Sequence, residues 1–168
     1  MARGVSVAGH KVIGAKHVRD GRPCQDDLRI EQHGSTIALA VADGHGSSVH
    51  AEIGARIAVQ VAAWALLEFA TNLGPGHRAD LRAVHGFAQD PLRRQIVREW
   101  VRQVQEHAGT DDVDVKDYGS TLIFALVTPE FLLLGQLGDG DLLVVASDGA
   151  VSRPLPADPV CFGEETSS

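Results

Sequence analysis

Apolar residues in the first half of the chain follow the period of strands and then that of a helix. Residues 36–42 (TIALAVA) are almost entirely apolar, which predicts a strand buried on both faces. Residues 28–33 predict a preceding strand, and the turn signal at residues 34–35 joins the two into a hairpin. A helix is expected next, with Ser47 or Ser48 as its N-cap. Its apolar stripe has spacings of three and four residues and consists of Ile53, Ile57, Val61, Trp64 and Leu67.

The second half of the chain predicts one more helix and a run of short strands. Asp90 is the expected cap of this helix, Pro91 fits its first position, and Gly109 is its stop signal. Its apolar face consists of Leu92, Ile96, Trp100 and Val104. Further strands are expected at residues 120–128, 131–137 and 142–147, and the turn signal at residues 148–149 leads into Val151.

Three remaining segments carry weaker signals. Residues 1–16 predict a short β segment, residues 17–27 are polar and predict a loop, and residues 77–89 fit neither period. The order of strands, two helices and strands is typical of an α+β fold with helices packed on an antiparallel sheet. Residues 1–168 are therefore interpreted as a single domain with its own core.

Composition excludes several classes of function. The net charge of −7 argues against nucleic acid as the main partner, because a phosphate backbone needs a basic surface. No membrane span is expected, since the longest apolar run, residues 57–67, is interrupted by Gln60 and is too short. Cys24 and Cys161 form no paired motif, and the N-terminus has no apolar signal core. These features predict a cytoplasmic protein.

Three acidic clusters, at residues 25–27, 43–46 and 138–141, coincide with predicted turns beside strands. Carboxylates at such positions are held by a rigid scaffold, and Mg²⁺ or Mn²⁺ prefers oxygen ligands. Asp43 follows the apolar strand, and Gly44 lets the backbone turn and can offer its carbonyl without a side chain in the way. His45 comes next and can carry a proton.

Ordered motifs give this pattern a specific resemblance. Residues 41–46 (VADGHG) resemble the Asp-Gly-His-Gly signature of metal-dependent serine/threonine protein phosphatases of the PPM type (type 2C). Residues 24–26 (CQD) resemble the early acidic motif of bacterial members. Further matches to the Gly-Ser-Thr strand, the Gly-Asp turn and a later stretch lie at residues 118–121, 137–141 and 163–166. The resemblance therefore covers nearly the whole chain.

The resemblance implies a β-sandwich flanked by antiparallel helices and a site for two divalent ions, Mn²⁺ or Mg²⁺. The aspartate matching Asp43 would bridge both ions, and the carbonyl matching Gly44 would bind one. Asp26 and Asp139 match further metal ligands, the latter for a third, weaker ion. A metal-activated water would hydrolyse phosphoserine or phosphothreonine in a protein, such as a target of a serine/threonine kinase. The histidine matching His45 would protonate the leaving oxygen.

The chain departs from the family pattern at three places. Gln25 stands where many members have a glutamate, so one contact near the metal loses its charge. Gly21 stands where many have an arginine that holds phosphate, which leaves Arg22 or Arg19 as a substitute if the loop shifts, with Arg22 as the candidate phosphate-binding residue. Residues 149–168 hold no match to the family's last two aspartate motifs, so the C-terminal third of the domain is expected to be missing. Asp141 is an equal candidate for the polar contact assigned to Asp139.

Two classes of function stay open from the sequence. The first is a PPM-type phosphatase domain, and the second is a truncated or degenerate module that binds a partner or phosphoprotein without turnover. A one-metal hydrolase of another kind is a third reading, which a preference for Zn²⁺ would favour. If the missing part supplies strands to the sandwich, the chain exposes an apolar sheet face. Marginal stability or self-association is then expected.

Overall fold

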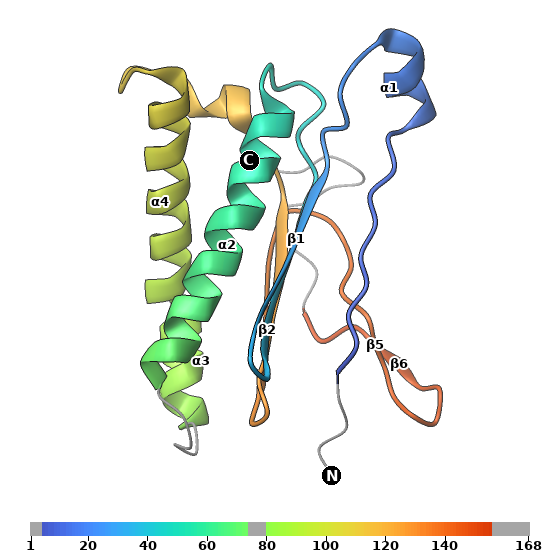
Figure 1. Ribbon diagram of the computed structural model, residues 1–168, viewed down its shortest axis with the longest axis vertical. Helices are drawn as coiled ribbons and strands as arrows, with labels where there is room; N and C mark the ends of the chain where they lie inside the picture. Colours follow the sequence, from blue (N-terminus) through green and yellow to red (C-terminus); the bar gives the residue numbers. More distant parts are fainter. Residues whose placement is uncertain (1–4, 74–79, 156–168) are drawn as a thin grey trace.

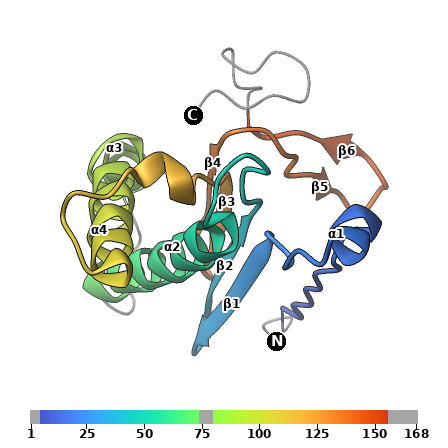
Figure 2. The same ribbon diagram turned by 90° about the horizontal axis from the view of Figure 1, so that it is seen from above.

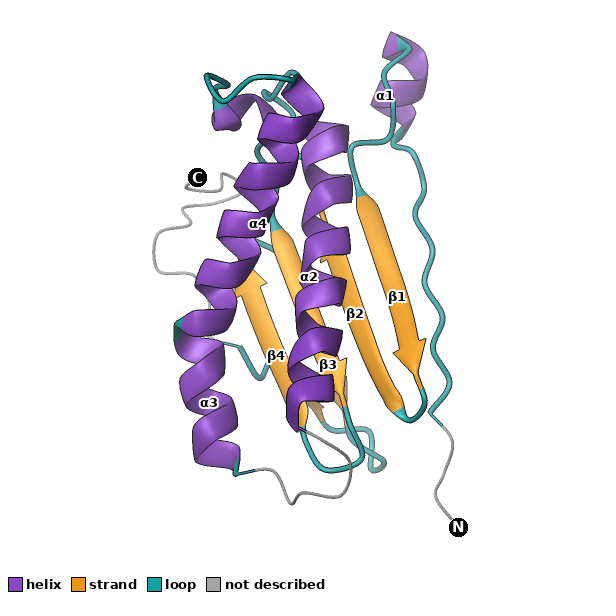
Figure 3. Cartoon of the chain, turned by 60° about the vertical axis from the view of Figure 1, so that its left-hand side comes forward, coloured by secondary structure: helices purple, strands orange, loops and turns teal. Residues whose placement is uncertain are grey.

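The computed structural model describes residues 5–73 and 80–155. At its centre lies a four-stranded antiparallel sheet with neighbouring strands in chain order. The strands are β1 (Asp27–His33), β2 (Thr36–Ala42), β3 (Leu122–Val127) and β4 (Leu132–Leu137). Three helices cover one face of this sheet, as Figures 1 and 3 show: α2 (Ala51–Leu73), α3 (Leu81–Gln89) and α4 (Pro91–Ala108). The predicted α+β class is confirmed, whereas the β-sandwich stays a prediction.

The β1–β2 hairpin has almost the bounds that the apolar pattern predicts. His33 pairs with Thr36, so the turn contains only Gly34 and Ser35. Gly34 has a φ of 61°, which lies in the left-handed region that glycine adopts at little cost. Strands β3 and β4 also fall inside their predicted ranges, since the apolar runs there are bounded by Thr128 and the glycine-rich residues 138–141.

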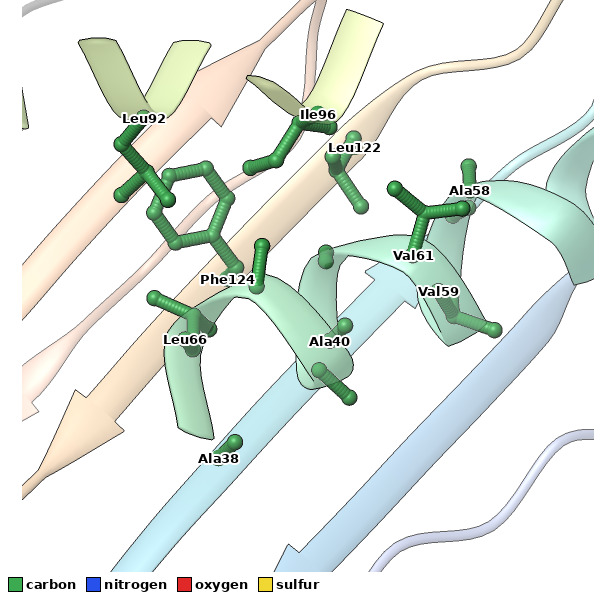
Figure 4. Close-up of a cluster of buried hydrophobic side chains, with 14 of the residues drawn as sticks. Ala38, Ala40, Ala58, Val59, Val61, Leu66, Leu92, Ile96, Leu122 and Phe124 are labelled. Atoms are coloured by element: carbon green, nitrogen blue, oxygen red, sulfur yellow. The ribbon is translucent and has the colours of Figure 1, made fainter. Parts of the chain in front are cut away.

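The core lies between the sheet and the helices. Ala38, Ala40 and Ala42 alternate along β2 toward α2, and all three are buried. Because these side chains are small, α2 can approach β2 closely, while larger residues of α4 and β3 fill the space beside it (Figure 4). The labelled examples on those two elements are Leu92, Ile96, Leu122 and Phe124.

Helix α2 is packed mainly through alanines. Its fully buried side includes Ala55, Ala62 and Ala65, whereas Trp64 is 51% exposed. The predicted core position of Trp64 is therefore wrong, because the sheet is approached by the small residues of the helix and not by its largest one. Trp100 on α4 is partly buried, and its indole Nε1–H donates a 3.0 Å hydrogen bond to the Gly54 carbonyl of α2.

By length and hydropathy alone, α2 could cross a membrane, with a mean hydropathy of 1.4. Its most apolar window is, however, 61% buried inside the fold. Burial of this kind is the pattern of a core helix, so α2 adds no evidence for a membrane span.

The ends of the helices correct some of the predicted caps. Helix α3 occupies part of the segment that fitted neither period, and the Asp80 carboxylate caps it by accepting from the Arg82 N–H at 2.9 Å. Helix α4 starts with Pro91 and ends at Gly109, which has a φ of 69°, as predicted. The Asp90 side chain does not cap α4, because it pairs with Arg94 at 2.7 Å.

The N-terminal segment differs from its prediction. Residues 5–14 contain no strand, and α1 (Ala15–Asp20) lies where a loop was expected. Gly21 ends this helix with a φ of 63°, a left-handed cap that satisfies carbonyl groups of the last turn. The β segment predicted for residues 1–16 is therefore wrong over its described part, and residues 1–4 lie outside the described residues.

The second face of the sheet is only partly covered. Val41 is 51% exposed on this face, so the prediction that residues 36–42 are buried on both faces is wrong there. On this side stands a separate hairpin of β5 (Val144–Val145) and β6 (Val151–Ser152), visible in Figure 2. Its turn at residues 148–149 is as predicted, with the Ala150 N–H donating to Asp148 Oδ1 at 2.9 Å.

Candidate metal and phosphate site

The antiparallel register brings the acidic motifs to one end of the sheet. Strands β1 and β3 begin there, and β2 and β4 end there, as the pairs Asp27–Ala42 and Leu122–Leu137 show. This end is at the top in Figure 3. The segments that follow or precede these strands therefore converge at this rim; they are residues 24–26, 43–46, 119–121 and 138–141.

Asp43 is fixed through its backbone. Its N–H donates to the Thr121 hydroxyl at 3.0 Å, and the Thr121 N–H donates to the Asp43 carbonyl at 2.8 Å. The Thr121 side chain is buried, so its hydroxyl is a fixed acceptor. The threonine of the Gly-Ser-Thr motif thus continues the β2–β3 pairing beyond the last strand residue and sets the direction in which Asp43 leaves the sheet.

Gly44 fits where no side chain fits. A Cβ at this position would lie 2.7 Å from the Ala51 carbonyl oxygen and 2.8 Å from the Gln25 carbonyl oxygen. The Gly44 N–H donates to that same Gln25 oxygen at 3.1 Å. This bond ties residues 43–46 to the segment that carries Asp26, and the close approach explains the glycine of the motif.

His45 is positioned by the Gly-Ser-Thr segment. Its N–H donates to the Gly119 carbonyl at 2.9 Å, and a Cβ on Gly119 would lie 2.6 Å from the His45 ring nitrogen Nδ1. Only glycine at residue 119 therefore leaves room for the imidazole. Ser48, one of the two residues predicted to cap α2, instead donates its hydroxyl to the Lys116 carbonyl at 2.7 Å, so the prediction is wrong for Ser48.

Asp43 and Asp26 are hydrogen-bonded through their side chains. Partial burial of the Asp43 carboxyl, this bond, and the negative charges of Asp26 and Asp139 together raise its pKa to about 6. Asp43 is nevertheless still reached by solvent. A proton shared by two carboxyl groups marks a place of concentrated negative charge that a bound cation would relieve.

The Gly-Asp turn presents Asp139 to this pair. Gly138 and Gly140 have φ values of 84° and 125°, which only glycine adopts readily. The Gln136 amide donates to the carbonyls of both, at 2.9 and 3.0 Å, and holds the turn closed. Asp141 instead forms an ion pair with Arg153 at 3.1 Å. Of the two candidates left open by the sequence, Asp139 is the one that acts on Asp43.

His17 acts in the opposite direction, since its charge lowers the pKa of Asp43. Arg22 is exposed just beyond the α1 cap, and its role as a phosphate-binding residue stays a prediction. Lys11 also approaches this end and forms a 2.8 Å ion pair with Asp27. No sequence pattern singles out His17 or Lys11, because both reach the rim through the path of residues 5–26.

The carboxylate oxygens of Asp26 and Asp43 suit Mg²⁺ or Mn²⁺. Asp26 and Asp43 fit such an ion, since Mg²⁺ is often held by one or two carboxylates with water as its other ligands. Within residues 5–73 and 80–155, no three His, Cys, Asp or Glu side chains are grouped closely enough to enclose a metal by themselves. The described residues therefore offer part of a coordination shell.

A family comparison decides the relationship that the motifs suggested. The sequence profile of the family described as Protein phosphatase 2C matches residues 13–168. The chain belongs to the protein phosphatase 2C family. A search of curated proteins gives no match. Family membership supports a phosphatase function in general, and the family depends on Mn²⁺ or Mg²⁺.

The structure brings together most of the residues that the phosphatase 2C motifs singled out. Asp26 and Asp43 are in contact, Asp139 acts on Asp43 through its charge, and Gly44 and His45 follow Asp43 directly. Gly119 and Thr121 belonged to a recognised motif, but their roles in positioning His45 and Asp43 become visible only in the fold.

Proposed function

We propose that the chain hydrolyses phosphoserine or phosphothreonine in proteins by a reaction that depends on Mn²⁺ or Mg²⁺. The observation that carries this proposal is the hydrogen-bonded pair of Asp26 and Asp43 at the rim of the sheet. The pair concentrates negative charge on a backbone that Thr121 and Gln25 hold in place. Such a pair repels a phosphate anion by itself, so a cation is needed before a phosphoryl group can approach.

The cation would be held by Asp43, Asp26 and Asp139, with the Gly44 carbonyl as a further oxygen donor. When bound, it supplies a hydroxide-like water at neutral pH and neutralises charge on the phosphoryl oxygens. The protein's own contribution is to hold these oxygens in place before the substrate arrives, which removes a reorganisation cost from the reaction.

His45 would hold the proton that the leaving serine or threonine oxygen requires. Its backbone bond to Gly119 and the close packing of its ring on that glycine restrict the imidazole to few orientations. A general acid held within reach of the leaving group typically contributes about 10²–10⁴-fold to the rate. The proposed partner of the chain is therefore its substrate, a phosphorylated protein.

Hydrolysis of an aryl phosphate and of a phosphothreonine peptide tests the proposal. Turnover is expected with Mn²⁺, and it should disappear with chelator and in Asp43→Asn. Asp148→Asn is the matched control, because Asp148 is an exposed carboxylate in the β5–β6 turn. Metal-dependent turnover that survives Asp43→Asn would overturn the assignment.

A non-catalytic module that binds a phosphoprotein is the second candidate. It is favoured by Gln25, which is buried and uncharged next to Asp26. This reading predicts binding of a phosphothreonine peptide without its hydrolysis, at most one weak metal site, and no gain in rate with Mn²⁺. Two divalent ions bound per chain would count against it.

A further inference from the structure

A groove runs along β4, the strand at one edge of the sheet. Its volume is about 740 Å³, which is within the range of sites that bind a ligand. All residues of β4 line it on one side, and residues of α3 and of the first half of α4 line it on the other. Figure 3 shows β4 as the outer strand on the side of these two helices. The groove therefore lies between the edge of the sheet and the helical layer.

The groove is lined mainly by apolar side chains, and several of them are exposed. Phe124 of β3 forms part of its floor, because the Phe124 ring lies against Gly135 of β4 and a Cβ on that glycine would collide with it. Four other lining residues are between 50% and 62% exposed, namely Leu81, Val97, Leu132 and Leu137. Large apolar residues that are exposed together in one hollow, instead of singly, indicate a binding surface.

Strand β4 has an open hydrogen-bonding edge. It pairs with β3 on one side, and no described strand pairs with it on the other. The N–H and C=O groups of such an edge can bind an extended peptide as an additional strand, while space beside the edge accepts alternate side chains. Because β4 has six residues, the edge is about 20 Å long. An extended segment of similar length fits along it.

The charge of the groove favours an acidic segment. Arg93 and His85 line it, and none of the described lining residues is an aspartate or a glutamate. Arg93 is exposed and forms no ion pair with a described residue, whereas the neighbouring Arg94 pairs with Asp90 at 2.7 Å. In a chain with a net charge of −7, such a place repels an acidic segment less than most of the surface does.

One end of the groove reaches the candidate metal and phosphate site. Leu137 and Gly138 line the groove, and Asp139 follows them directly. The strand register places residues 138–141 at the same rim as residues 43–46. Helix α3 lies toward the opposite end, at the bottom of Figure 3. A segment in the groove can therefore continue into a phosphorylated residue at the rim.

We propose that this groove binds an extended segment of the phosphorylated protein substrate as a strand added to β4. The inference rests on the proposed phosphatase function and names the kind of substrate which that site takes. The segment is apolar with acidic residues, to match the lining of the groove. It follows the phosphorylated residue in sequence, because antiparallel pairing is slightly more stable than parallel pairing and an antiparallel strand runs from the rim toward Leu132.

Three phosphothreonine peptides test the charge and the direction of the segment. In the first, the phosphothreonine is followed by a stretch in which valine and glutamate alternate. In the second, the glutamates are replaced by lysines, and in the third the valine and glutamate stretch precedes the phosphothreonine. KM should be about tenfold lower for the first peptide than for the other two, with similar kcat, because docking contributes to binding and leaves the chemistry unchanged.

Two variants and one control connect this preference to the groove. Arg93→Glu should raise KM for the first peptide about fivefold and lower it for the lysine peptide. Leu81→Ser should raise KM for both, because apolar contact is lost. Arg98→Glu is the control, since it makes the same charge change on α4 outside the residues that line the groove.

An aryl phosphate is too small to extend along β4, so its kinetics should be unchanged in all three variants. Equal KM values for the three peptides in an active wild-type chain would overturn the docking groove and leave the phosphatase function intact.

Amide hydrogen exchange in β4 gives a readout that needs no turnover. An unphosphorylated form of the first peptide should slow exchange in residues 132–137 of the wild type, and should do so less in Arg93→Glu. A chain that shows this protection but hydrolyses no phosphopeptide would overturn the phosphatase function and support the groove. Protection that grows with protein concentration without peptide would assign the groove to a second copy, and protection that the peptide leaves unchanged would assign it to the chain itself. Either result would overturn the inference.

Discussion

Asp43 and Thr121 exchange two backbone-directed hydrogen bonds across 78 residues of sequence. The Thr121 hydroxyl accepts from the Asp43 N–H, and the Thr121 N–H donates to the Asp43 carbonyl. A buried threonine in the Gly-Ser-Thr motif therefore sets the position of the aspartate in the Asp-Gly-His-Gly motif. Two motifs that lie far apart in the sequence are thus tied together through the backbone of Asp43 and both polar groups of Thr121.

Thr121→Val should distinguish the effect of Thr121 on the position of Asp43 from its effect on the stability of the fold. Valine has the same shape but cannot accept from the Asp43 N–H, so the free energy of unfolding should fall by about 1–3 kcal/mol. Hydrolysis with Mn²⁺ should fall much further, because Asp43 is then less well oriented. Thr128→Val is the control: its hydroxyl accepts from the Phe131 N–H at 2.9 Å at the other end of β3. That variant should lose stability but keep the activity of its folded fraction.

Gly119→Ala should displace His45. The added Cβ would lie 2.6 Å from Nδ1 of the imidazole, so the ring has to turn away from its present place. The expected result is a loss of kcat of about 10²-fold or more toward substrates with poor leaving groups, which need a general acid. An aryl phosphate has a better leaving group and should be affected less.

Gly86→Ala is the matched control for this glycine. Gly86 lies within α3, and an added Cβ meets nothing within 4 Å. Alanine there should leave turnover unchanged and stabilise the helix by about 1 kcal/mol or less. Equal loss of activity in both variants would contradict a specific role of Gly119.

The metal-free chain should lose stability as the pH rises through about 6. In the folded chain, partial burial, the bond to Asp26 and the neighbouring charges raise the pKa of Asp43 to about 6. In the unfolded chain the carboxyl group of Asp43 has the ordinary pKa of an aspartate, about 4. The stabilisation from this group is thus complete below pH 4 and lost as the pH rises through 6.

Asp43→Asn removes this dependence and serves as the reference. The free energies of unfolding of both proteins, measured with chelator between pH 4 and pH 7, should diverge as the pH rises, with the wild type losing stability relative to the variant. A constant difference over that range would show that Asp43 titrates like an ordinary surface carboxyl group.

The partly open sheet face should make the described fold prone to self-association. Val41 is 51% exposed on that face, whereas Val97 is 53% exposed on α4. Sedimentation velocity over a concentration series should show a rising weight-average mass that Val41→Lys reduces more than Val97→Lys does. A monomer at all concentrations would remove this expectation.

Much of the fold follows from local patterns. The β1–β2 hairpin, the start and end of α4 and the α+β class all rest on periodicity and on residues such as Gly34, Pro91 and Gly109. Helix α1 was missed because its end depends on one left-handed glycine within a polar segment. Trp64 was misplaced because large residues dominate an apolar stripe, while alanines make the actual contact with β2.

The site was predictable to the extent that motifs carry it. Asp26, Asp43 and Asp139 could be singled out because glycine turns and strand ends accompany them. The effect of His17 on the pKa of Asp43 could not be predicted, since it depends on the path that residues 5–26 take to the end of the sheet. The choice between Asp139 and Asp141 needed the Arg153 ion pair, which no spacing in the sequence indicates.

The central claim is that Asp26 and Asp43 share a proton that a divalent cation replaces. Calorimetric titration with Mn²⁺ at pH 6, in buffers of different ionisation enthalpy, measures the protons released on binding. The account predicts binding with release of about half a proton, because Asp43 is half-protonated at its pKa, and no such release in Asp43→Asn. Mn²⁺ binding of equal strength and equal proton release in wild type and variant would contradict it.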